Sequence, residues 1–179
     1  MKYLFLLIIS GLLFTNCTST QTVTTDQDNN VEEEEVDKDR FAPEWYNEEE
    51  KSATDSLSFS GYSYAIAEGE DRAREQSERV ALSNLRFEID RFVESARAEL
   101  EEENGNDPFG SQRLIMNVRN AVQNLDLSET ELDYDIQIEN GFHHVFTKAE
   151  ISRERVVDML TEVISNPTLS ASLEDQQVL

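Results

Sequence analysis

The feature that most restricts the fold of this chain is a long segment, residues 70–103, that contains neither glycine nor proline. Apolar residues recur there at steps of three or four and would form one stripe along a helix. The stripe comprises Ala81, Leu85, Ile89, Phe92, Ala96 and Leu100. We therefore predict one helix of roughly thirty residues, whose apolar face must be buried by other elements.

Strand patterns occur both before and after this helix in the sequence. Residues 57–67, LSFSGYSYAIA, combine aromatic and β-branched residues with partial alternation, and Gly61 marks a bulge or a close approach. Residues 132–138, LDYDIQI, alternate strictly, with acids or glutamine on one face. Because Asn140-Gly141 favours a tight turn, residues 135–151 are predicted to form a β-hairpin.

Two further helices follow from the same kind of pattern. One carries the stripe Leu114, Val118, Val122 and Leu125, and the other begins after Ser152, a favourable N-cap. We expect the second to end near Asn166-Pro167 and residues 167–179 to be a loose tail. The prediction is a single α+β domain over residues 41–166, with a mostly antiparallel sheet of about three strands covered on one face by the long helix and shorter helices.

The predicted domain begins at an aromatic cluster, FAPEWY, residues 41–46. Trp45 and Tyr46 have large apolar faces with polar tips, so we expect them to anchor the start of the domain on its core. The alternative is that the same two rings anchor a partner.

The N-terminus has the composition of a secretory signal. Lys2 precedes a short apolar stretch that is too short to cross a bilayer, and LFTNC ends at Cys17, the one cysteine of the chain. LFTNC resembles a bacterial lipobox, with Phe14 and Asn16 at positions that usually hold Leu and Gly or Ala. The resemblance implies that residues 1–16 are a signal peptide that is removed, and that Cys17 then carries diacylglycerol and a fatty acid such as palmitate. A soluble secreted protein with a free thiol is the alternative.

Residues 17–40 are predicted to be a disordered acidic tether behind this lipid anchor. They contain few apolar residues and include the run Glu32 to Glu35, so they cannot bury enough surface to fold. The whole chain has 38 acidic and 15 basic residues, a net charge of −23. This charge argues against nucleic acid as a partner, because proteins that bind phosphates carry basic patches.

The sequence contains no pattern typical of an enzyme or a metal site. His143 and His144 are adjacent on a predicted strand and would point to opposite faces, so they cannot ligate one metal ion together. Acidic runs such as Glu48 to Glu50 and Glu101 to Glu103 are typical of solvated surfaces. We expect no catalytic residues, no bound metal and no cofactor beyond the lipid on Cys17.

The order of elements resembles the LPP-twenty family of envelope lipoproteins, which is of Helicobacter type and related to the flagellar lipoprotein FlgP. The resemblance covers residues 42–164 and rests on PEWY, on LSFSGYSYAIA, on the helix start GEDRAREQSERVALSNL and on the late hairpin. It implies a bacterial outer-membrane lipoprotein without catalytic residues, facing the periplasm or the cell surface. Its partners would be envelope or flagellar proteins, or further copies of itself.

Two functions are therefore open. The first is a structural or interaction role in the cell envelope. The alternative is a module that binds a small ligand, glycan or lipid between sheet and helices, in a pocket lined by Phe59, Tyr62, Tyr64 and Phe146.

Overall fold

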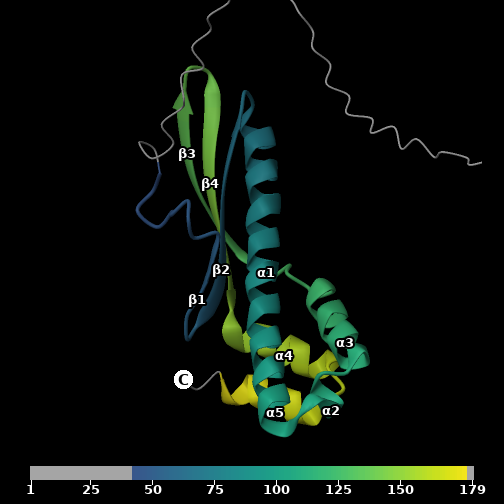
Figure 1. Cartoon of the computed structure of the whole chain (residues 1–179). Coiled ribbons are helices and arrows are strands. Elements are labelled where there is room, and N and C mark those ends of the chain that lie inside the picture. Colours follow the sequence, from purple (N-terminus) through teal and green to yellow (C-terminus); the bar gives the residue numbers. More distant parts are fainter. Residues whose placement is uncertain (1–41, 177–179) are drawn as a thin grey trace, which may run out of the picture. The chain divides into compact units, whose positions relative to one another are not determined.

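The computed structural model describes residues 42–176. They form a four-stranded antiparallel sheet, with one long helix along one face and short helices gathered at the C-terminal end of that helix (Figure 1). The strands are β1 (Ser52–Thr54), β2 (Ser58–Ala67), β3 (Glu131–Glu139) and β4 (Phe142–Ser152). The helices are α1 (Glu70–Asn104), α2 (Asn106–Phe109), α3 (Gln112–Gln123), α4 (Arg153–Val163) and α5 (Pro167–Asp175). The predicted α+β class is confirmed.

The sheet has the order β1-β2-β4-β3. β3 and β4 form the predicted hairpin, and Asn140 and Gly141 at its turn have φ values of 51° and 83°. These left-handed values are those of a type I′ turn, which suits the twist of the flanking strands. β1 was not predicted, because three residues are too few to show an alternating pattern.

α1 packs closely on the middle of β2 and β4, where small residues face each other. Ala73, Ser77 and Ala81 of α1 are fully buried. A Cβ atom placed on Gly61 of β2 would lie 2.2 Å from the backbone oxygen of Ala81. Gly61 therefore marks a close approach of helix and strand, one of the two roles that the sequence indicated for it.

Buried hydroxyl groups bridge this narrow seam. The Ser63 hydroxyl donates to the backbone oxygen of Ser77 at 2.6 Å. The Ser77 hydroxyl in turn lies 2.7 Å from the Thr147 hydroxyl on β4. Hydroxyl groups buried without partners would be costly, so these bonds allow small polar residues to fill a space that is too narrow for large apolar side chains.

The main apolar core lies around the lower half of α1. Phe59 of β2 is fully buried and packs against Phe92 of α1, with ring centroids 5.2 Å apart. The rest of the predicted stripe is buried there as well, together with apolar residues of the short helices: Leu85, Ile89, Ala96, Leu100, Val118, Val122, Val156 and Leu160. The long helix thus covers the sheet with its first half and organises the short helices with its second half (Figure 1).

The expected loose tail is wrong for residues 167–175, which form α5. The Asn166 side chain accepts a hydrogen bond from the backbone amide of Leu169 at 3.0 Å, and Pro167 occupies the first turn. Asn-Pro often marks the end of a helix. Proline is equally favoured at the first helical position, and Asn is a strong N-cap, so the same pair begins a new helix here.

Arginine side chains tie the helices together. Arg86 of α1 donates to the backbone oxygens of Val122 and Gln123 at 2.6 Å each, and so satisfies the open carbonyl groups at the end of α3. Arg97 donates to the backbone oxygen of Phe109 at 2.7 Å. Its hydrogen bonds to neighbouring glutamates raise the pKa of Arg97 above its usual range.

Candidate functional site

The face of the sheet that points away from α1, the outer face, carries an aromatic cluster. Its members are Trp45, Tyr46, Tyr62, Tyr64 and Phe146. The ring of Trp45 lies 6.1 Å from that of Tyr62, and the ring of Tyr46 lies 4.9 Å from that of Phe146. Trp45 and Tyr46 are half-buried and therefore pack on the sheet. A role of these rings in binding a partner stays a prediction.

The two histidines lie on opposite faces of β4. The Nδ1 atom of His144 is 2.8 Å from the Tyr64 hydroxyl, and this ring extends the aromatic cluster. The Nδ1 atom of His143, on the α1 side, is 3.9 Å from a carboxylate oxygen of Glu70. Within residues 42–176, no three acidic, histidine or cysteine side chains converge in a way that could hold a metal ion.

A pocket of about 290 Å³ lies beside the aromatic cluster, at the edge of β2, where the segment before β1, β2 itself and α1 meet. Tyr46, Tyr62 and Tyr64 line it, and the Asn84 amide on its wall donates to the backbone oxygen of Tyr62 at 2.7 Å. Phe59 is not part of it, because Phe59 points into the core on the other side of β2. The four aromatic residues suggested by the sequence therefore do not share one pocket.

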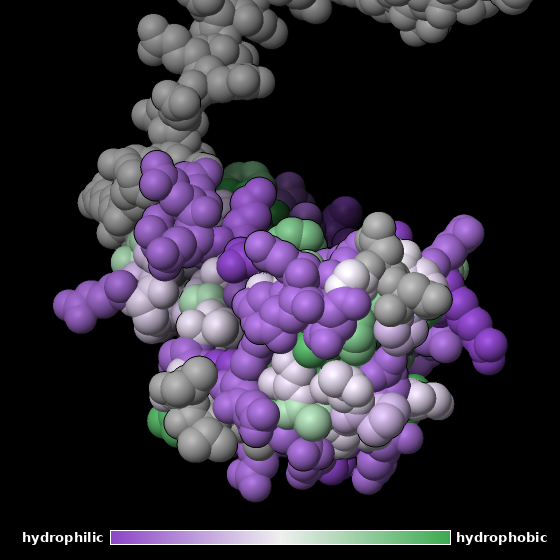
Figure 2. Space-filling view, turned by 60° about the horizontal axis from the view of Figure 1, so that its bottom comes forward, coloured by the Kyte–Doolittle hydropathy of each residue, from purple (hydrophilic) through white to green (hydrophobic). Residues whose placement is uncertain are grey.

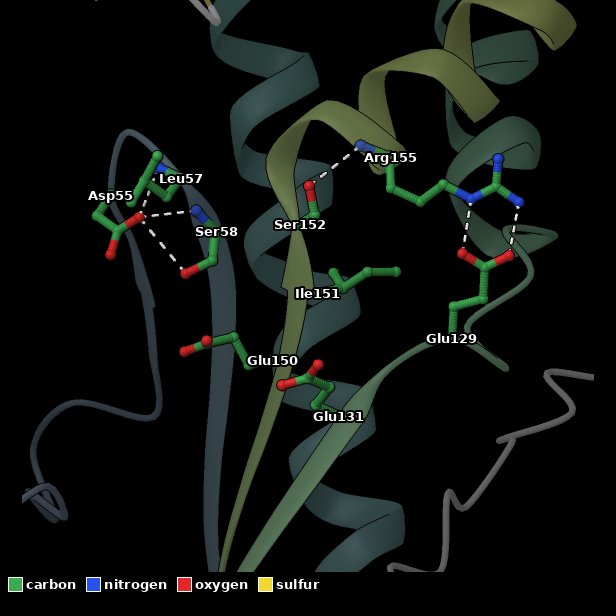
Figure 3. A pocket seen from close by; sticks show the side chains of 9 residues that line it. All are labelled: Asp55, Leu57, Ser58, Glu129, Glu131, Glu150, Ile151, Ser152 and Arg155. Carbon is green, nitrogen blue, oxygen red and sulfur yellow. Dashed lines mark hydrogen bonds and ion pairs between the residues drawn. The ribbon is translucent and has the colours of Figure 1, made fainter.

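A second pocket, of about 390 Å³, lies at the end of the sheet where β1 turns into β2 and β4 leads into α4 (Figure 3). Its polar groups maintain the local structure: the Ser152 hydroxyl caps α4, and Arg155 forms a two-bond ion pair with Glu129 at 2.9 and 3.0 Å. Glu131 and Glu150 face the hollow from adjacent strands. Sequence reasoning missed this pocket, because strand register alone brings its three chain segments together.

Asp55 at the rim of this pocket gives a prediction about pH. Its carboxylate accepts the backbone amides of Leu57 and Ser58 at 2.7 Å each, and these bonds hold its pKa below the usual 3.8. Because the pKa is lower in the folded state, the stabilisation is complete above pH 5 and is lost as pH falls through 3.8 and below. Asp55→Ala should lower the free energy of unfolding at pH 7 by about 1 kcal/mol or less. Urea unfolding at pH 7 and pH 3 checks this, since a difference of the same size at both pH values would contradict it.

Acidic side chains line the outer face of β3. The Tyr134 hydroxyl donates to Glu78 of α1 at 3.0 Å, so the even-numbered residues of β3 face the helix and the odd-numbered ones face outward. The odd-numbered residues are Glu131, Asp133, Asp135, Gln137 and Glu139. Lys148 on β4 lies opposite Asp133 and forms an ion pair with Glu150, whose hydrogen bond raises the pKa of Lys148. One lysine therefore faces several carboxylates.

The surface at the lower end of the domain is mostly hydrophilic, and its hydrophobic residues form small separate spots (Figure 2). Among the helices of residues 42–176, none has both the length and the apolar composition needed to cross a membrane. Cys17 and the residues of the lipobox and the tether lie outside the described residues.

Comparisons with known proteins find no relative. No protein-family model matches the sequence, and neither a curated protein nor a solved structure matches it significantly.

Proposed function

We propose that this protein is a bacterial envelope lipoprotein, anchored in the outer membrane through acylated Cys17, whose α+β domain has a structural or interaction role. The observation that carries the proposal is the ending LFTNC, where a short apolar segment after Lys2 stops at the one cysteine of the chain. Each buried methylene of an acyl chain contributes about 0.8 kcal/mol to membrane binding, so several chains on one cysteine anchor a protein stably.

The surface of the domain supports a role in contacts with other proteins. In the pocket of Figure 3, the Asp55 carboxylate, the Ser152 hydroxyl and the Arg155–Glu129 pair all maintain local structure. The outer face instead combines exposed acids with aromatic rings, a combination suited to contact with other proteins. This role agrees with the resemblance to the LPP-twenty family, and the partners would be envelope or flagellar proteins.

The lipid anchor is tested by replacing Cys17. We expect the N-terminal peptide of the wild-type protein to begin at Cys17 and to carry acyl mass, because signal removal and acylation act at that residue. Cys17→Ala should abolish the acyl mass and lower the membrane-bound fraction at least tenfold, as several buried acyl chains are lost. Mass spectrometry of membrane extracts and fractionation measure both effects.

The matched control is Ser19→Ala, which changes a nearby small residue and leaves the cysteine intact. It should be acylated and retained like the wild type. An unmodified Cys17 in a protein recovered from the soluble fraction would refute the anchor.

A second candidate function is a module that binds a small ligand, glycan or lipid. The pocket of about 290 Å³ favours it, because three tyrosines line that pocket and aromatic rings are common in ligand sites. A screen of oligosaccharides by NMR tests it, and shifts confined to Tyr46, Tyr62 and Tyr64 would support it. The absence of any shift would remove ligand binding as a candidate and leave only the interaction role.

A further inference from the structure

β3 is an edge strand whose outer side is available for pairing. It lies at the end of the sheet, and among the described residues it pairs with β4 alone. It is also long for an edge strand, since it contains 9 residues. An edge of this kind offers a row of main-chain donors and acceptors to another strand.

The hydrogen bonds of the sheet identify which main-chain groups of β3 point away from β4, toward the open edge of the sheet. The amide of Tyr62 donates to the oxygen of Lys51 on the β1 side at 2.8 Å, and the amide of Arg153 donates to the oxygen of Leu57 at 2.8 Å. Even-numbered residues of β2 thus bond toward β1 and odd-numbered ones toward β4. The register pairs odd-numbered residues of β2 with odd-numbered residues of β4, so the even-numbered residues of β4 bond toward β3. Their partners on β3 are the odd-numbered residues, which therefore bond to β4. The main-chain groups that point toward the open edge, away from β4, therefore belong to Leu132, Tyr134, Ile136 and Ile138.

The side chains beside this edge determine which strand it can accept. Glu131, Asp133 and Asp135 lie on the outer face at intervals of roughly 6.8 Å, the spacing of alternate residues in any strand. A second copy of β3 paired there would bring acids against acids, which is destabilising. A strand with lysine or arginine at alternate positions would instead bring opposite charges together across the new pair.

We propose that the outer edge of β3 binds an extended basic segment of a partner protein as an added strand. Main-chain bonds to the outward groups of β3 would supply the binding mode, and alternate Lys or Arg side chains facing the carboxylates would supply selectivity. The acids of the outer face thereby discourage pairing between copies of this chain and favour a basic partner. The proposal rests on the proposed function only in taking the domain as an interaction module.

The test uses the full mature chain and a blocked nine-residue peptide of alternating Lys and Val, with a peptide of alternating Glu and Val for comparison. We expect the Lys peptide to bind at low salt at least tenfold more tightly than the Glu peptide, and to weaken as salt is raised. Hydrogen exchange should slow at the amides of Leu132, Tyr134, Ile136 and Ile138. Binding without this protection, or no binding, would overturn the proposal.

Two pairs of variants separate strand addition from general attraction. Ile138→Pro removes an outward amide from an edge position whose side chain is 66% exposed, and Ile138→Ala keeps the amide. We expect Ile138→Pro to weaken binding about tenfold relative to Ile138→Ala. Glu131→Lys/Asp135→Lys should also weaken it at least tenfold, whereas Glu102→Lys/Glu103→Lys, with the same change in net charge on an exposed part of α1, should leave it within twofold.

Other outcomes would contradict the proposal. Equal loss in both charge-reversal variants would mean nonspecific attraction. Protection of the same amides in the chain alone, lost on dilution, would mean that a second copy occupies the edge; protection that is independent of concentration would mean that a segment of the same chain does. A negative result here leaves the lipid anchor untouched, because that is measured separately by the mass of the Cys17 peptide.

Discussion

Gly61→Ala should lower the free energy of unfolding by about 3 kcal/mol or more, the upper end of the range for overpacked sites. The added Cβ would lie 2.2 Å from the oxygen of Ala81 and 2.4 Å from the nitrogen of Leu85. Both are backbone atoms of α1, so no side-chain rotation relieves the contact, and helix and sheet must move apart. Separation would also stretch the bonds among Ser63, Ser77 and Thr147. Urea unfolding followed by circular dichroism measures the change.

The matched control is Gly69→Ala at the start of α1. A Cβ atom there meets nothing within 4 Å, and φ of −113° suits any residue. We expect a loss of about 1 kcal/mol or less, because Gly69 is the N-cap of α1 and alanine is less favoured than glycine there. If Gly61→Ala were as mild as this control, the close packing of α1 on β2 would be refuted.

Sequence periodicity was sufficient for the long elements of this fold. α1 ends at Asn104, one residue beyond the segment predicted to be helical, and Gly105 follows as its C-cap, because the φ of 85° there is readily adopted only by glycine. The hairpin and the Ser152 cap were predicted for similar reasons, since each depends on neighbours in the chain. β1 and α5 were missed, because a three-residue strand has no period and Asn166-Pro167 can either end or begin a helix.

The surface sites were less accessible to sequence reasoning. The alternation in LDYDIQI indicated that the acids of β3 share one face, and the register agrees. Successive side chains of a strand point to opposite faces, so Phe59 lies on the opposite face of β2 from Tyr62 and Tyr64. The predicted pocket shared by all three is therefore wrong. The meeting of Asp55 with Glu131 and Arg155 in one pocket depends on register between distant strands, which no local pattern encodes.

Leu169→Ala and Leu173→Ala should each lower the free energy of unfolding by about 2–5 kcal/mol, the range for buried leucines. Both side chains are fully buried, although they lie beyond the point where the sequence suggested that the domain ends. Arg153 also donates to the backbone oxygen of Gln176 at 2.8 Å, which ties the end of α5 to the start of α4. Leu57→Ala is the matched control, because that leucine is 77% exposed. It should change stability by no more than about 0.5 kcal/mol.

The comparison decides whether α5 belongs to the cooperative unit. If it does, each buried substitution shifts the whole urea transition and leaves a single step, since loss of leucine leaves a cavity against the core. If residues 167–175 were a loose segment, all three variants would have nearly the same free energy of unfolding. An intermediate result, in which α5 melts before the sheet, would appear as early exchange of the Ser170 amide, which donates to Asn166 at 3.0 Å. We expect that amide to exchange as slowly as those of α4, because the fully buried Leu169 and Leu173 cannot leave the core without exposing it.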